Sequence, residues 1–243
     1  MTLLHAAPTG LRPLWNGHIE TEIRNAREGR PAHIWAKVNS LQDTDIIKRL
    51  YEASQAGVKV DLVVRGVCGV KAGLPGVSEN IRVVSILGRH LEHHRIFRFL
   101  NGGRDNVYLA SADWMVRNLD KRVETCFPIL DAGIKARVIR VLDAALADNI
   151  KAREMDEDGV FTRSVKAEDA PGVNFQAWCY DSVSGAPTVE IPAAPAAAPA
   201  EKPAPAAPAP VDESVFRAPD WIPDEDDNDP LEGETPLPRP DKE

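Results

Sequence analysis

The sequence contains few cysteines and no long apolar run. Its three cysteines are widely spaced and form no Cys-x-x-Cys pair, which fits a reducing compartment and argues against a thiolate zinc site. No run of eighteen apolar residues occurs, and residues 1–14 lack the basic start and apolar stretch of a signal peptide. These absences predict a soluble cytoplasmic protein without a transmembrane segment, and no metal-ligating motif is present.

A Walker-type phosphate loop is also absent. The glycines at positions 66, 69, 73 and 76 follow an apolar run and allow close backbone approach to a phosphate group. Their spacing does not match the Walker pattern, so this loop alone does not identify a nucleotide site.

Acidic residues in excess are confined to the C-terminal end. Residues 212–243 hold twelve acidic and three basic side chains, a net charge of -9, and the rest of the chain is close to neutral. Between them, residues 192–210 are alanine and proline with one Glu and one Lys, a composition that favours extended polyproline conformations and cannot form an apolar core. We therefore predict one folded domain over residues 1–165, a poorly defined extension over 166–185 and a disordered tail over 186–243.

Two aromatic segments lie after the predicted domain. Residues 173–180 are aromatic enough to dock somewhere, although no chemistry follows from them. Phe216, Trp221 and Ile222 are isolated apolar residues in the acidic tail. They are either a short partner-binding motif or, as we favour, part of a solvated tail.

Periodicity predicts alternating helices and strands. Predicted helices cover residues 14–28, 43–57 and 131–146, and predicted strands cover 32–38, 58–64, 81–87, 96–99, 107–112 and 122–129. Asp43 and Asp131 are good N-caps, and one apolar face of the third helix is expected to cover the sheet. Strand, helix and strand in succession imply a right-handed crossover with parallel pairing, so the fold class is α/β. Trp114 and Met115 are expected to be packing residues.

A histidine-rich segment precedes a predicted β-hairpin. His93 and Arg95 lie at the entry of its first strand, and Asp113 to Asn118 lie at the exit of the second. These ends are side by side in an antiparallel pair. An imidazole and a guanidinium facing a carboxylate and an amide can bind a phosphoryl group and move a proton. The alternative is that the histidines are ordinary surface residues.

Two further cations follow the predicted parallel strands. Lys37 and Arg65 lie near the carboxyl ends of their strands, where ligands collect in open α/β sheets, so they are candidates to face one site. The alternative for Arg65 is a surface ion pair. Glu124 either orients an active-site histidine or pairs with Arg122 or Lys121.

Three separated motifs carry a resemblance to a known family. They are Val63-Val64-Arg65-Gly66, Leu91-Glu92-His93-His94-Arg95 and the run from Ala110 to Glu124. In this order they resemble the last catalytic domain of bacterial long-chain polyphosphate kinases, from near Leu3 to about Arg163. The resemblance implies a phospholipase D-like mixed sheet flanked by helices. The phospholipase D signature is altered to His93-x-Arg95 and Ala110-Ser111-x-Asp113, which argues against a general phosphodiesterase.

The resemblance also implies roles for individual residues. His93 matches the family's second active-site histidine and Arg65 a phosphate-contacting arginine, whereas the histidine that becomes phosphorylated belongs to a domain that nothing here matches. The predicted site is therefore His93 as the catalytic residue, with phosphate or ATP bound by Arg65, Arg95, Lys37, Asp113, Arg117 and Asn118.

The implied function is reversible transfer of the terminal phosphate of ATP to inorganic polyphosphate, with Mg²⁺ as cofactor. By resemblance we also expect a homo-oligomer, a complementing chain that carries the other domains, and no nucleic-acid partner. The alternative is a stand-alone domain that binds polyphosphate or a partner chain without catalysis.

Overall fold

The structure is a computed structural model that describes residues 3–164 and 170–191. In this part of the chain, nine strands form one sheet in the order β1-β7-β6-β5-β2-β3-β4-β8-β9. The strands are β1 (His5–Ala6), β2 (His33–Val38), β3 (Lys59–Val64), β4 (Ile81–Ile86), β5 (Ile96–Phe99), β6 (Asn106–Ala110), β7 (Thr125–Pro128), β8 (Ala152–Met155) and β9 (Phe161–Arg163). The central strands β2, β3 and β4 are parallel, and their other neighbours are antiparallel.

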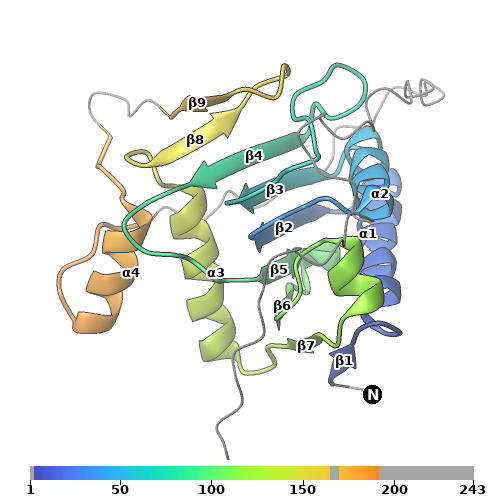
Figure 1. Ribbon diagram of the computed structural model, residues 1–243, viewed down its shortest axis with the longest axis horizontal. Coiled ribbons are helices and arrows are strands. Elements are labelled where there is room, and N and C mark those ends of the chain that lie inside the picture. Colours follow the sequence, from blue (N-terminus) through green and yellow to red (C-terminus); the bar gives the residue numbers. More distant parts are fainter. Residues whose placement is uncertain (1–2, 165–169, 192–243) are drawn as a thin grey trace, which may run out of the picture.

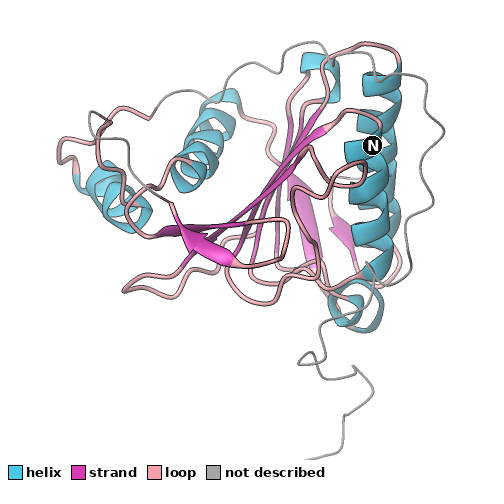
Figure 2. Cartoon of the chain, turned by 90° about the horizontal axis from the view of Figure 1, so that it is seen from above, coloured by secondary structure: helices cyan, strands magenta, loops and turns pink. Residues whose placement is uncertain are grey.

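Helices cover both faces of the sheet (Figure 1). They are α1 (Leu11–Arg27), α2 (Thr44–Gln55), α3 (Ala132–Leu146) and α4 (Phe175–Ser184), with a 3₁₀ turn η1 (Asn101–Gly103) and a π-helical turn η2 (Arg117–Lys121). Figure 2 shows α1 and α2 on one side of the strands, and α3 and α4 on the other. The main core lies under α1 and α2, and smaller clusters lie under α3 and α4. The predicted mixed α/β sheet flanked by helices is confirmed.

Local sequence signals correctly predicted the first half of the fold. The Asp43 carboxylate accepts a hydrogen bond from Ile46 N at 2.9 Å, which caps α2, and Gly57 ends the helix at a φ of 90°. The predicted parallel pairing of β2 with β3 and the hairpin of β5 with β6 are confirmed. Trp114 and Met115 are buried, as expected for packing residues.

The second half departs from the predictions. The strand predicted over 122–129 is limited to β7, and β8 and β9 were not foreseen. Asp131 caps α3 as predicted, with Ile134 N donating at 2.8 Å, but Ile134 is 53% exposed instead of covering the sheet. The reason is that α3 packs on the sheet through its C-terminal half, where Leu142, Ala144 and Ala145 are buried.

The structure describes only part of the predicted extension and tail. Residues 175–184 of the extension form α4, which docks through buried Phe175 and Trp178. The predicted disordered tail lies outside the described residues from position 192 onward. Within residues 3–164 and 170–191, no helix has both the length and the apolar character of a membrane span.

Glu22 connects α1 to the start of β2 and to the turn that follows β5. Its carboxylate accepts hydrogen bonds from the backbone N–H groups of His33, at 3.2 Å, and Asn101, at 2.5 Å. Burial raises the pKa of Glu22 to about 7. Folding therefore takes up a proton between the pKa of the unfolded chain and this higher value, so the folded state loses stability as pH rises through that window.

We expect this proton to appear in a comparison with Glu22→Gln. Between pH 5 and pH 7, the wild-type free energy of unfolding should fall by about 2 kcal/mol relative to that of the variant. Urea titrations at pH 5, 6, 7 and 8 measure the difference. Parallel pH profiles for the two proteins would show that Glu22 is ionised throughout this range in the folded state.

Candidate functional site

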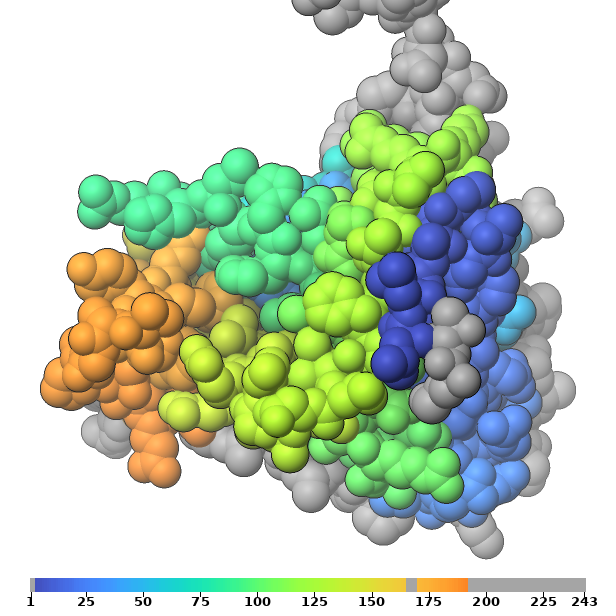
Figure 3. Space-filling view, turned by 90° about the horizontal axis from the view of Figure 1, so that it is seen from below, coloured from blue at the N-terminus to red at the C-terminus, as the bar shows by residue number. Residues whose placement is uncertain are grey.

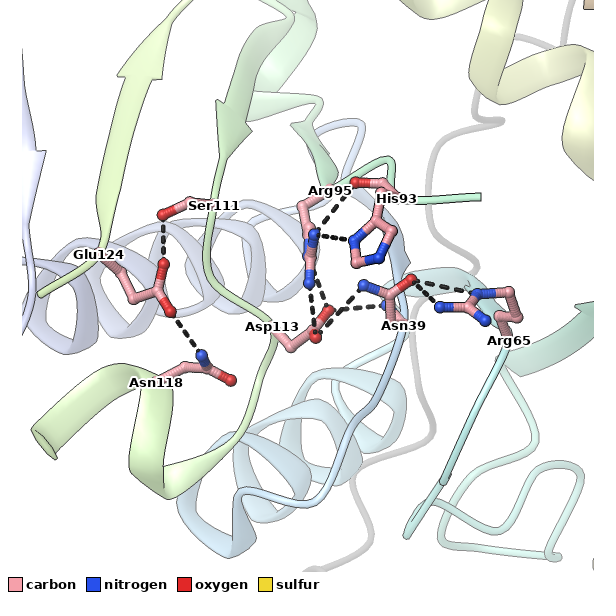
Figure 4. A network of polar contacts seen from close by, with 8 residues as sticks. All are labelled: Asn39, Arg65, His93, Arg95, Ser111, Asp113, Asn118 and Glu124. Atoms are coloured by element: carbon pink, nitrogen blue, oxygen red, sulfur yellow. Dashed lines mark hydrogen bonds and ion pairs between the residues drawn. The ribbon is translucent and has the colours of Figure 1, made fainter. Parts of the chain in front are cut away.

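A continuous polar network links His93 to Arg65 (Figure 4). Arg95 donates to Asp113 through Nε at 3.2 Å and Nη2 at 3.1 Å, a bidentate pair, and its Nη1 lies 2.8 Å from Nδ1 of His93. Asp113 also accepts from the backbone N–H of Asn39 at 2.7 Å. The amide oxygen of Asn39 in turn accepts from Nε and Nη2 of Arg65 at 3.2 and 2.9 Å.

Each member of this network comes from the end of a central strand. Asn39 follows β2 and Arg65 follows β3, so both lie at the carboxyl edge of the parallel strands. Arg95 precedes β5, and Asp113 lies three residues beyond the end of β6. Because β5 and β6 are antiparallel, the start of one lies beside the end of the other. The predicted proximity of the histidine segment and Asp113 is therefore confirmed.

Burial divides the network into an inner pair and an outer histidine. The side chains of Arg95 and Asp113 are 16% and 9% exposed, whereas His93 is exposed. Since a guanidinium can donate but not accept, Nδ1 of His93 acts as the acceptor beside Arg95. In the neutral imidazole, Nε2 then carries the proton and is available to an incoming anion.

A second network connects the histidine segment to β2 and α4. The Lys37 ammonium is 2% exposed and lies 2.6 Å from Oε2 of Glu92, which is 5% exposed. Gln176 of α4 donates to Oε1 of Glu92 at 2.7 Å and to the carbonyl of His90 at 2.8 Å, and it accepts from His90 N at 2.9 Å. Lys37 therefore does not face the same site as Arg65 but fixes the residue before His93.

A third cluster lies beside β6 and β7. Glu124 accepts a short hydrogen bond from the Ser111 hydroxyl and a second one from Asn118 Nδ2 at 2.7 Å. Among the described residues it forms no hydrogen bond or ion pair with a histidine, Arg122 or Lys121, so neither interpretation of Glu124 is correct. Asn118 is buried, and Arg117 is exposed with no side-chain hydrogen bond to another described residue. Of the seven predicted site residues, His93, Arg65, Arg95 and Asp113 lie in one network, and Lys37, Arg117 and Asn118 lie outside it.

Three residues in these networks were missed. Asn39 has no predicted role, although an amide at the carboxyl end of a parallel strand is itself a signal for a site. Glu92 was noted only within a motif. Gln176 lies 84 residues beyond Glu92, and no local pattern indicates that contact.

The described residues provide no metal cage. No group of three or more His, Cys, Asp or Glu side chains that could hold a metal ion occurs in residues 3–164 and 170–191. Both oxygens of Asp113 already accept hydrogen bonds from Arg95. The side chains present therefore do not fit a protein-bound Mg²⁺ ion.

We expect Gln176→Ala to loosen the histidine segment. Loss of the three amide contacts frees the backbone at His90 and one oxygen of Glu92, so amide hydrogen exchange over residues 88–95 should accelerate about tenfold. Exchange measured by mass spectrometry on peptides covering this segment checks the effect. The matched control is Gln55→Ala, which removes an exposed amide bond to the Gly76 carbonyl. Equal exchange at residues 88–95 in all three proteins would show that Gln176 does not hold this segment.

An α/β domain with arginines and a histidine gathered at its strand ends suggests a phosphate-handling class of protein. The family model for Polyphosphate kinase C-terminal domain 2 matches residues 4–176. The chain belongs to this family.

Relatives and a solved structure that are similar to this chain agree with this family assignment. A polyphosphate kinase of Pseudomonas putida is 51% identical over 182 residues, which cover 75% of this chain and 25% of the relative. One of Bacillus anthracis is 54% identical over 156 residues, which cover 64% and 22%. The crystal structure of the Porphyromonas gingivalis polyphosphate kinase is 39% identical with a TM-score of 0.73, over 76% of this chain and 28% of that one. The chain thus spans about a quarter of the length of these proteins.

Proposed function

We propose that the chain is a catalytic module of a polyphosphate kinase that binds the phosphates of ATP and inorganic polyphosphate at the His93 to Arg65 network. It would act in reversible transfer of the terminal phosphate of ATP. The observation that carries the proposal is that two arginines and one histidine form a single connected network at the strand ends. Phosphoryl transfer depends mainly on positioning and on neutralising charge, which such a network supplies.

The arginines have different tasks in this proposal. Arg95 uses Nε and Nη2 on Asp113 and Nη1 on His93, so it orients the imidazole. Arg65 uses Nε and Nη2 on Asn39, and its Nη1 has no partner in the described part of the chain. That nitrogen is free to donate to a phosphate oxygen, and Nε2 of His93 supplies the proton during transfer.

The remaining predicted residues have supporting roles. Lys37 holds Glu92, and through it the backbone before His93. Exposed Arg117 is available to the outer part of a long phosphate chain, and Asn118 positions Glu124. Mg²⁺ would arrive bound to the nucleotide, with phosphate oxygens and water as its ligands. We place the protein in the cytoplasm, as a homo-oligomer acting together with the other domains found in its relatives.

The second candidate function is a binding module without catalysis. The observation that favours it is that Nη1 of Arg65 has no partner among the described residues and can bind a phosphate oxygen whether or not transfer occurs. Such a module would still bind polyphosphate through Arg65. It would gain no activity from any complementing chain, and this separates the two candidates.

Polyphosphate binding by Arg65→Ala tests the binding half of the proposal. We expect the substitution to weaken binding by about 1.5 to 3 kcal/mol, because it removes charge-assisted hydrogen bonds. Calorimetric titration with polyphosphate measures the loss. Arg82→Ala is the matched control. This half-exposed arginine lies on β4 and pairs with Glu154 of the neighbouring strand β8. Equal affinity in wild type and Arg65→Ala would remove Arg65 from the site.

Turnover by His93→Ala tests the catalytic half. The substitution should barely change polyphosphate binding above pH 8, because binding does not require a charged imidazole. With the other domains supplied as a separate chain, it should lower turnover about a hundredfold or more. His90→Ala is the control within the same segment. The double variant with Arg65→Ala should show less than additive losses, because both residues act on one ligand. Wild-type turnover in His93→Ala would refute the catalytic assignment.

A further inference from the structure

An apolar groove lies between α3 and α4, on the face of the sheet opposite α1 and α2. Its volume is about 440 Å³, and apolar atoms come from Ile134, Val138, Val141, Trp178, Cys179 and Val183. Figure 3 shows α3 (yellow-green) and α4 (orange) side by side, with the surface hollowed between them. Ile134 is 53% exposed and Val183 is 82% exposed, so the groove presents apolar side chains to solvent.

Cations lie along the wall of this groove. Arg137 and Arg140 of α3 both line it and are exposed. Within residues 3–164 and 170–191, neither arginine forms an ion pair with another residue. The Arg140 guanidinium lies 5.6 Å from the ring of Trp178, which leaves its N–H groups available to an anion. The groove therefore suits a ligand that combines apolar and acidic groups.

The chain itself contains a segment of this composition. Residues 211–227 hold Phe216, Trp221 and Ile222 among seven acidic side chains and one arginine. No other stretch of the C-terminal region combines two aromatic residues with such charge. The segment is thus complementary to the groove in both polarity and sign.

The path of the chain leads from the groove to this segment. Ile191, the last residue that the structure describes, packs against the apolar cluster that contains Trp178 of the groove, so the chain leaves the domain near the groove. From Ile191 to Phe216, 24 residues intervene. At about 3.1 Å per residue and a persistence of several residues, such a linker is long enough to turn back. A tethered segment of this kind has an effective concentration of about 1 mM.

We propose that residues 211–227 bind in the α3–α4 groove of the same chain. Phe216 and Trp221 occupy the apolar floor, and the acidic side chains pair with Arg137 and Arg140. For a modest dissociation constant of about 0.1 mM, the groove is free only about a tenth of the time. His94, the residue after His93, also lines the groove, but no member of the His93 to Arg65 network does, so the inference stands whether or not the proposed function is correct.

The rate at which Cys179 is alkylated reports whether the groove is occupied, because this residue lines the groove and is partly buried. In the full-length chain, Phe216→Ala combined with Trp221→Ala should make alkylation of Cys179 by iodoacetamide about tenfold faster. Burial raises the pKa of this thiol to about 11, so the assay is run near pH 9. Cys68 and Cys126 lie elsewhere in the fold and are internal controls whose rates should not change.

Two further arms make the result specific. Leu231→Ala with Leu237→Ala, in the same tail but outside the segment, should leave Cys179 protected. A synthetic peptide of residues 211–227 should restore protection to the double aromatic variant, and Arg137→Ala with Arg140→Ala should weaken that effect about tenfold. Equal alkylation rates in wild type and the aromatic variant would overturn the proposal. Protection that rises with chain concentration would also overturn it, because the occupant would then be a second copy.

Discussion

Replacing Lys37 by methionine is expected to lower the free energy of unfolding by about 4 kcal/mol. Methionine is also unbranched and only one heavy atom shorter, so the loss reflects mainly the charge and not a cavity. The Lys37 and Glu92 side chains are 2% and 5% exposed, and breaking a buried pair by removing one partner leaves an uncompensated charge in a low-dielectric site. Gln176 retains one bond to Glu92 but carries no charge to replace the ammonium.

A double variant and an exposed pair serve as controls. Lys37→Met with Glu92→Gln removes both charges and should recover about half of the loss, since no charge is then buried alone. Arg82→Met breaks the pair with Glu154, whose partners are 40% and 43% exposed, and should cost less than about 1 kcal/mol. Urea unfolding of the four proteins gives the values. A loss in Lys37→Met no larger than that in Arg82→Met would mean that the ion pair contributes little.

Replacing Asp148 by alanine should cost about as much, by a different mechanism. This carboxylate is 3% exposed. Its Oδ1 accepts from the backbone N–H groups of residues 150, 151 and 152 at 2.9, 2.6 and 3.0 Å, and its Oδ2 accepts from Phe175 N at 2.8 Å. Alanine leaves these donors without the carboxylate, and the N–H groups of Ala152 and Phe175 are buried, where water does not replace it. Each such loss costs about 1 to 3 kcal/mol and the losses are not additive, so we expect about 4 kcal/mol in total.

An exposed aspartate provides the comparison. Asp156 accepts from the backbone N–H groups of Asp158 and Val160 in an exposed turn, where water replaces the carboxylate. Asp156→Ala should therefore cost less than about 1 kcal/mol. Asp148→Asn retains one oxygen and should lie between the two alanine variants. Thermal and urea unfolding measured for all three would contradict this account if Asp148→Ala and Asp156→Ala lost the same stability.

Local sequence patterns predicted several features of the fold but not the roles of Lys37 and Asp148. The hairpin and the N-caps of α2 and α3 depend on residues within a few positions of one another, so turn, alternation and capping signals predicted them. The parallel pair was predicted from the order strand, helix, strand. From the same local reasoning, Arg95 and Asp113 were expected to meet, because the two ends of a hairpin must be adjacent.

Long-range contacts carry no such signal. Lys37 lies near the end of a strand and looked available to a ligand, but α4 covers that face and Phe175 lies 5.3 Å from its ammonium. Asp148 joins the end of α3 to the start of α4 across 27 positions. Since nothing in the neighbourhood of either residue indicates which distant segment packs against it, both roles required the tertiary structure.

The order of strands has a consequence for the time at which the site is assembled. Arg65 and Asn39 belong to the β2–β3 unit, Arg95 and Asp113 to the β5–β6 hairpin, and the two units meet where β2 pairs with β5. That contact joins Ile34 to Phe99, so a long loop must close before it forms, at an entropic cost that local contacts do not carry. During refolding, the proposed binding of polyphosphate should therefore appear after most helical signal has been regained, and its onset would report the last sheet-forming step.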